Sequence, residues 1–222
     1  MTQYNHSQSP SLGQNKQIDD NAQESSENDN RRKSARNISV LQIGKLVTDR
    51  DQMLCLVKNI SAGGAKVYAL RSLAVDKRLR IEFRSGITVD GSTIWADGLT
   101  AGIRFDHEID ISQLVGSGAE SIRAGQFPRH PRLDIIAAAT MKWDESSAAG
   151  EVINISQTGV CIEAHPLPLV HQRVTLKVEN LPTLQARVVW RNDRRAGLAF
   201  NQSLPYEMLG HWVMEQRPRR FL

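Results

Sequence analysis

The most constraining feature of the chain is an internal repeat at a separation of 95 residues. The stretch NISAGG at 59–64 returns as NISQTG at 154–159, with Asn, Ser and Gly at identical spacing. Three later residues return at the same separation: Trp95, Gly102 and Phe105 as Trp190, Gly197 and Phe200. A period of this length is too long for a solenoid repeat and fits a small domain. We therefore predict a tandem duplication of one fold.

Hydrophobic alternation predicts that both repeats consist of β-strands. Residues 79–83 alternate apolar and polar side chains, and residues 174–178 do the same one repeat later. This period of two is typical of antiparallel strands with one buried face. Short polar segments at 96–98 and 192–195 predict hairpin turns between strands. Many short strands in so few residues favour a small closed or nearly closed barrel.

A change in composition near residue 30 separates a tail from the folded part. The first residues are rich in Gln, Asn, Ser and Asp and cannot bury enough apolar surface to offset the entropy of ordering. A helix is expected after each barrel, at 110–115 and at 204–213, where apolar residues recur on one face. The predicted segments are a disordered tail (1–30), a first domain (31–120), a linker (121–126) and a second domain (127–222).

Charge and cysteine content indicate a compartment and a class of partner. Residues 1–30 have one lysine and five acidic residues, so the net charge of +4 leaves +8 on residues 31–222. Such a basic part favours anionic partners, although a solvated basic surface explains the charge equally well. Cys55 and Cys161 do not correspond between the repeats and form no C-x-x-C pair. With no signal peptide and no long apolar run, we expect a cytoplasmic protein without direct membrane insertion.

The repeated Asn-x-Ser-x-x-Gly motif is the main candidate for function. A single copy would indicate only an ordinary turn, because Asn and Ser bond their own backbone and Gly accepts a positive φ. Here it occurs twice, and Arg32 and Arg36 form an Arg-x-x-x-Arg ahead of the first copy. With the later Trp and Gly-x-x-Phe, this arrangement resembles the PilZ domain family over residues 31–120 and about 127–216. The resemblance implies six-stranded antiparallel β-barrels, each with a C-terminal helix, that in many members bind cyclic di-GMP.

By this resemblance, the first repeat holds a cyclic di-GMP site formed by an arginine arm and the barrel wall. A guanidinium donates two parallel hydrogen bonds to a phosphate or a guanine edge and also stacks on a purine. Asn59 and Ser61 would bond the nucleotide, and Gly64 would leave room for it. Arg31 adds a donor that accompanies a stacked nucleotide dimer in the family. The predicted site residues are Arg31, Arg32, Arg36, Asn59, Ser61 and Gly64.

The second repeat departs from this pattern. The offset places Phe127 and Pro131 where the two arginines stand in the first repeat, and the arginines present are Arg129 and Arg132. Loss of a charged bidentate contact costs about 1.5–3 kcal/mol. We therefore predict tight binding in the first domain and weak or no binding in the second, whose arginines could instead cap the barrel. The candidate weaker site comprises Arg129, Arg132, Asn154, Ser156 and Gly159.

Other residue types give no catalytic or metal site. Trp95 and Trp190 are expected in the core, because each lies at a strand position with a matched Gly and Phe. The histidines do not cluster at metal-ligand spacing, and His165 and His171 are expected in a loop. No nucleophile elbow, phosphate loop or His-Glu pair is present. The sequence thus predicts no enzyme activity, no metal and no cofactor.

These observations predict a non-enzymatic cyclic di-GMP receptor with two tandem barrels. Nucleotide binding would order the arginine arm and change contacts with an unidentified protein partner, with motility, biofilm or exopolysaccharide as implied outputs. A PilZ-like scaffold that binds protein partners without nucleotide stays open as the alternative. Binding of single-stranded nucleic acid is disfavoured, because only 5% of the residues are aromatic. Oligomeric state does not follow from the sequence.

Overall fold

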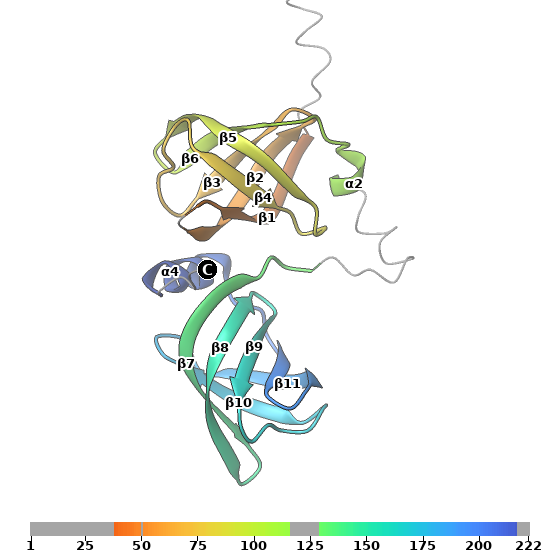
Figure 1. Ribbon diagram of the computed structural model, residues 1–222, viewed down its shortest axis with the longest axis vertical. Coiled ribbons are helices and arrows are strands. Elements are labelled where there is room, and N and C mark those ends of the chain that lie inside the picture. Colours follow the sequence, from red (N-terminus) through yellow and green to blue (C-terminus); the bar gives the residue numbers. More distant parts are fainter. Residues whose placement is uncertain (1–37, 50, 116–128, 217–222) are drawn as a thin grey trace, which may run out of the picture. The chain divides into compact units, whose positions relative to one another are not determined.

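The computed structural model describes residues 38–49, 51–115 and 129–216, and in this part of the chain two closed antiparallel barrels of six strands each are present (Figure 1). In the first barrel the neighbouring strands follow the order β1-β2-β3-β6-β5-β4, and pairing of β1 with β4 closes it. Its strands are β1 (Ile38–Val47), β2 (Gln52–Ser61), β3 (Gly64–Ala69), β4 (Arg78–Glu82), β5 (Thr88–Asp97) and β6 (Thr100–Phe105). The arginine arm predicted at Arg31, Arg32 and Arg36 lies outside the described residues.

The second barrel repeats this topology. Its order is β10-β11-β12-β9-β8-β7, closed by pairing of β10 with β7. The strands are β7 (Leu133–Trp143), β8 (Ser146–Ser156), β9 (Gly159–Ala164), β10 (Arg173–Val178), β11 (Leu184–Arg191) and β12 (Arg195–Phe200). The prediction of two tandem six-stranded barrels is confirmed.

The two barrels match down to their irregularities. Each has three β-bulges, at which the strand register shifts, and the bulges lie at corresponding positions. In the first barrel they lie between Ser39 and Gln42, Val57 and Asn59, and Thr93 and Trp95. In the second they lie between Asp134 and Ala137, Val152 and Asn154, and Val188 and Trp190. A bulge adds one unpaired residue and reverses the inside-outside alternation beyond it. The repeat therefore preserves both the strands and the places where their alternation changes phase.

Alternating burial gives each barrel its own core. In β4 the buried residues Leu79 and Ile81 alternate with exposed arginines, and Val174 and Leu176 are buried at the corresponding places in β10. Full burial of such side chains contributes about 1.5–3 kcal/mol each. The strands predicted from alternation at 79–83 and 174–178 are confirmed.

The helices differ between the repeats. After the first barrel, α2 (Ser112–Val115) is one turn long and begins where the Asp110 carboxylate accepts the Ser112 backbone N–H at 3.0 Å. After the second, α4 (Tyr206–Glu215) buries Leu209 and Trp212, and the Trp212 indole N–H donates to the Glu179 carbonyl at 2.8 Å. Of the helices predicted at 110–115 and 204–213, the second is therefore the longer. No helix in the described ranges has the length and apolar character needed to span a membrane.

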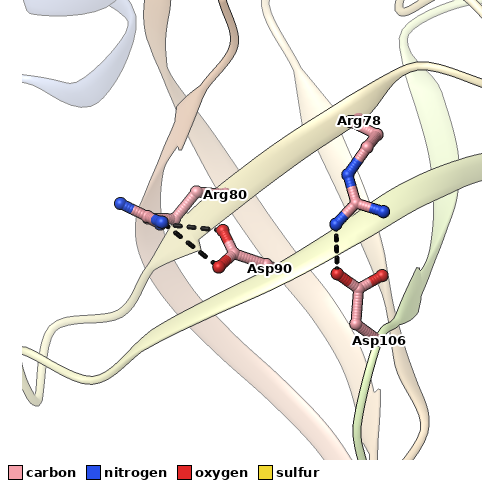
Figure 2. A network of polar contacts seen from close by, with 4 residues as sticks. All are labelled: Arg78, Arg80, Asp90 and Asp106. Atoms are coloured by element: carbon pink, nitrogen blue, oxygen red, sulfur yellow. Dashed lines mark hydrogen bonds and ion pairs between the residues drawn. The ribbon is translucent and has the colours of Figure 1, made fainter.

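An ion-pair network covers part of the outer face of the first barrel (Figure 2). Arg80 donates to Asp90 from Nε at 2.8 Å and from Nη2 at 3.2 Å, and Arg78 donates to Asp106 at 2.5 Å. The hydrogen bond from Arg80 holds the pKa of the Asp90 carboxyl below its usual range. These pairs link β4 to β5 and to the end of β6, and they neutralise the exposed arginines of β4.

Candidate functional site

The first barrel carries a groove of about 370 Å³ on its outer surface, over strands β2, β3, β5 and β6. The groove brings together the predicted motif residues with two basic residues and an aromatic ring. None of the described residues that line it is acidic. Its polar, charged and aromatic side chains are Asn59, Ser61, Lys66, Trp95 and Arg104.

Strand register places these side chains in two adjacent rows on one face of the sheet. Residues that pair across antiparallel strands share a face, so a row of pairs crosses the groove from strand to strand. The first row runs Asn59, Lys66, Gly102, Trp95, through the pairs of β2 with β3, β3 with β6, and β6 with β5. The second row runs Ser61, Gly64, Arg104, Ser92 in the same strand order. The bulge after Val57 lets Asn59 enter this face.

The motif turn is built by the backbone of the barrel. The Ser61 hydroxyl donates to the Gly64 carbonyl at 3.2 Å, and the Phe105 N–H donates to the Gly63 carbonyl at 2.9 Å. A Cβ on Gly64 would lie 2.5 Å from the carbonyl oxygen of Ile103 on β6. Strand packing alone therefore requires glycine at this position, in addition to the predicted need for room beside a ligand.

Trp95 and Trp190 lie in the grooves and not in the core, so the core prediction was wrong. Their side chains are 40% and 41% exposed. Each ring lies against a glycine of the next strand, where a Cβ on Gly102 or Gly197 would come within 2.0 Å of the indole nitrogen. The bulge explains the error, because it breaks the alternation after buried Thr93 and leaves the next two residues facing outward.

Two basic residues of the first groove were missed by the sequence analysis. The Lys66 ammonium lies 5.9 Å from the Trp95 ring centroid, within cation–π range, and Arg104 is exposed opposite Gly64. Their spacing could have identified them, because Lys66 stands two residues after Gly64 and Arg104 two residues after Gly102. Period two places each on the same face as a motif glycine.

The second barrel has a groove at the corresponding place. Its rows run Asn154, Cys161, Gly197, Trp190 and Ser156, Gly159, Ala199, Arg187. The Ser156 hydroxyl again donates to the Gly159 carbonyl at 3.2 Å. The lining includes the predicted Arg129, Arg132, Ser156 and Gly159, together with His130 and Trp190, whereas Asn154 and Arg187 do not line it.

Strand pairing fixes how the second pair of arginines relates to the first. Leu133 pairs with Ile155 as Ile38 pairs with Ile60, so the offset of 95 holds at the start of the barrel. Pro131 therefore takes the place of Arg36 in the sequence alignment. A shift of one residue would be needed to align Arg132 with Arg36, and the strand register shows no such shift. Even so, both Arg129 and Arg132 reach the groove from the segment before β7.

His130 adds a polar group between these arginines. Among the described residues, its buried Nδ1 has no hydrogen-bond partner. Burial lowers the pKa of His130. The lowered pKa favours the neutral ring, in which one nitrogen donates and the other accepts. Elsewhere in the described ranges, no three His, Cys, Asp or Glu side chains gather as a metal site would require.

Comparison with known proteins gives a family match. The model of the PilZ domain matches residues 30–117 and 126–214. No curated protein matches the chain at a significant level.

Three of the similar solved structures come from different bacteria. One is PlzA of Borreliella burgdorferi in complex with c-di-GMP, at 13% identity and a TM-score of 0.36, covering 83% of this chain and 89% of that one. A second is the inhibitor of motility MotI (DgrA) of Bacillus subtilis, at 15% identity and a TM-score of 0.33, covering 80% of this chain and 96% of that one. A third is YcgR of Escherichia coli in complex with c-di-GMP, at 12% identity and a TM-score of 0.31, covering 78% of this chain and 81% of that one.

Proposed function

The chain belongs to the PilZ domain family, and on this basis we propose that it is a non-catalytic receptor for cyclic di-GMP in the bacterial cytoplasm. The observation that carries the proposal is the first groove. There the repeated Asn and Ser lie in rows with two cations and a half-exposed tryptophan, and no acidic residue of the described ranges lines the groove. This combination suits a ligand that has both negative charge and flat rings.

Cyclic di-GMP has these features, because it carries two phosphates and two guanines. Guanidinium groups bind phosphates and guanine edges through paired hydrogen bonds, and they stack on purines. We assign this role to Arg32 and Arg36, with Arg31 as an additional donor, because they precede the first barrel as the family motif requires. Asn59 and Ser61 would complete the site from the barrel wall.

The mechanism that we propose is fixation of the arginine arm by the nucleotide. Binding would join the arm to the barrel wall and so change the surface that a protein partner contacts, in the control of motility, biofilm or exopolysaccharide. The second groove has arginines at other positions and would bind the nucleotide more weakly. If neither groove binds nucleotide, the remaining function is that of a scaffold for protein partners.

Calorimetric titration of cyclic di-GMP into the full chain and into Arg32→Ala/Arg36→Ala tests the proposal. We expect micromolar or tighter binding by the wild type and a loss of at least about 100-fold in the variant, because two charged contacts of about 1.5–3 kcal/mol each are removed. A matched control is Lys58→Ala/Lys77→Ala, which removes two charges outside the groove and should bind as the wild type does.

The stoichiometry of the same titration compares the grooves. We expect one strong site, and Arg129→Ala/Arg132→Ala should abolish only a weaker second phase. Two sites of equal affinity would contradict the predicted difference between the repeats. No heat and no thermal shift with the wild type would refute the receptor proposal and leave the scaffold.

A further inference from the structure

We propose that Lys66 and Arg104 bind the phosphates of the ligand on the wall of the first groove, and that this pair makes the first groove the stronger site. The proposal deepens the receptor function and rests on it. It adds two residues outside both the Arg-x-x-x-Arg and the Asn-x-Ser-x-x-Gly motifs.

The first argument is the geometry of a four-residue block on β3 and β6. Lys66 pairs with Gly102, and Arg104 pairs with Gly64, so the two cations occupy diagonal corners and the two glycines the others. Diagonal neighbours on such strands lie about 7–8 Å apart. Neither glycine contributes a side chain, so the floor between the cations is backbone at Gly64, while the Trp95 indole lies over Gly102. An anion that approaches the Gly64 side of this floor, beside the indole, can contact both cations.

The second argument is charge compensation on the first barrel. Three arginines outside the groove have acidic partners: Arg71 pairs with Asp51, and Arg78 and Arg80 pair with Asp106 and Asp90, as Figure 2 shows for the last two pairs. Lys66 and Arg104 form no ion pair with any residue that the structure describes, and the groove lining has no carboxylate. The contact with Trp95 keeps the Lys66 ammonium over the groove. Two uncompensated cations on either side of this floor form an anion site.

The third argument is the comparison with the second barrel. In the corresponding block the glycines are retained as Gly159 and Gly197, but Cys161 and Ala199 replace the cations. The block thus keeps its backbone geometry and loses its charge. The nearest arginine of that row, Arg187, stands one strand farther away and does not line the groove.

The test exchanges the two cations for the residues of the second repeat. Cyclic di-GMP is titrated into full-length Lys66→Cys/Arg104→Ala at low and high salt, in an Arg129→Ala/Arg132→Ala background that silences the second groove. We expect at least about tenfold weaker binding than in the background alone, and a shallower salt dependence, because two charged contacts are lost. The matched control is Lys58→Cys/Lys77→Ala. It removes the same charge and a similar lysine–aromatic contact, at 4.9 Å from Tyr68, outside the groove, and should change affinity less than twofold.

A charge-conserving variant separates charge from packing. Lys66→Arg/Arg104→Lys should retain affinity within a few-fold. A loss of affinity as large as that in Lys66→Cys/Arg104→Ala would overturn the phosphate role. Unchanged affinity and salt dependence in Lys66→Cys/Arg104→Ala would also overturn it. Absence of binding already in the background protein, together with absence in the wild type, would refute the receptor function itself and not the assignment of these two residues.

Discussion

The two barrels have the same backbone and different charges, and the difference shows which parts of the fold can change. Both keep the turn glycine, the glycine beneath the tryptophan and all three bulges. In the first barrel the groove cations lie on the wall, as Lys66 and Arg104, whereas in the second Arg129 and Arg132 come from the segment before β7. The backbone irregularities fix the groove, and the outward side chains around it vary.

The same contrast holds away from the grooves. The Arg80–Asp90 ion pair is replaced by a hydrogen bond of 3.2 Å from Thr175 to Gln185 at the corresponding pair of positions. Inside the barrel, buried Cys55 corresponds to Gly150. At both places the side chains differ between the barrels, and the strand pairing around them is the same.

The largest expected effect concerns the glycines that both barrels share. Gly64→Ala should destabilise the first barrel by about 1–3 kcal/mol, because the new Cβ would meet a backbone oxygen that cannot move by itself. The predicted contact is 2.5 Å from Ile103 O, and Gly159→Ala meets Leu198 O at the same distance. Urea unfolding measures the change.

The adjacent Gly63 provides the control for this prediction. A Cβ at that position meets nothing within 4 Å, so Gly63→Ala should leave the unfolding midpoint nearly unchanged. Equal destabilisation by Gly63→Ala and Gly64→Ala would show that the contact between strands does not account for the glycine requirement.

An intermediate effect at high pH concerns the buried Cys55 thiol of the first barrel, whose position is Gly150 in the second. Burial raises the pKa of the Cys55 thiol from 9.0 to about 12. The unfolded chain therefore releases this proton at lower pH than the folded chain does. The stabilising contribution is complete below pH 9, and it decreases as the pH rises from 9 to 12, by up to about 1.4 kcal/mol per pH unit.

Cys55→Ala should remove this part of the pH dependence. Urea unfolding of the wild type and of the variant between pH 9 and 11 gives two slopes, whose difference isolates the thiol from the other groups that titrate in this range. Identical slopes would show that the thiolate is accommodated in the folded barrel.

The smallest effect is expected at the surface pair. Arg80→Thr/Asp90→Gln gives the first barrel the residues of the second and removes a fully exposed ion pair, whose contribution is small and screened by salt. We expect no measurable change in the thermal unfolding midpoint at physiological salt. A marked decrease that persists at high salt would show that this pair contributes more than exposed pairs normally do.

The sequence predicted much of the fold because its main evidence was geometric. Alternation located the strands, and the offset of 95 residues survives in the register of both barrels. The first helix was harder to predict, because the residues after Val115 include Gly116 and Gly118, which weaken any helix, and residues 116–128 lie outside the described ranges.

The candidate site was predicted less completely. Ser61 and Asn59 were found from the motif, and the structure brings both into the first groove. Trp95 was misplaced because a single bulge reverses which residues face outward, and alternation alone cannot reveal a bulge. Lys66 and Arg104 became recognisable only when register showed that two separate strands place them around one patch of the groove.

The position of each tryptophan on its glycine gives the protein a built-in optical probe in each groove. An indole that is about two-fifths exposed emits according to the polarity around it, and a purine or phosphate that enters the groove alters that polarity directly. Trp95 and Trp190 occupy equivalent places in separate grooves, so replacing one with phenylalanine leaves a single groove tryptophan, whose change is read against the constant emission of the buried Trp143 and Trp212. Occupancy of the two grooves can then be followed separately in the intact chain, without any external label.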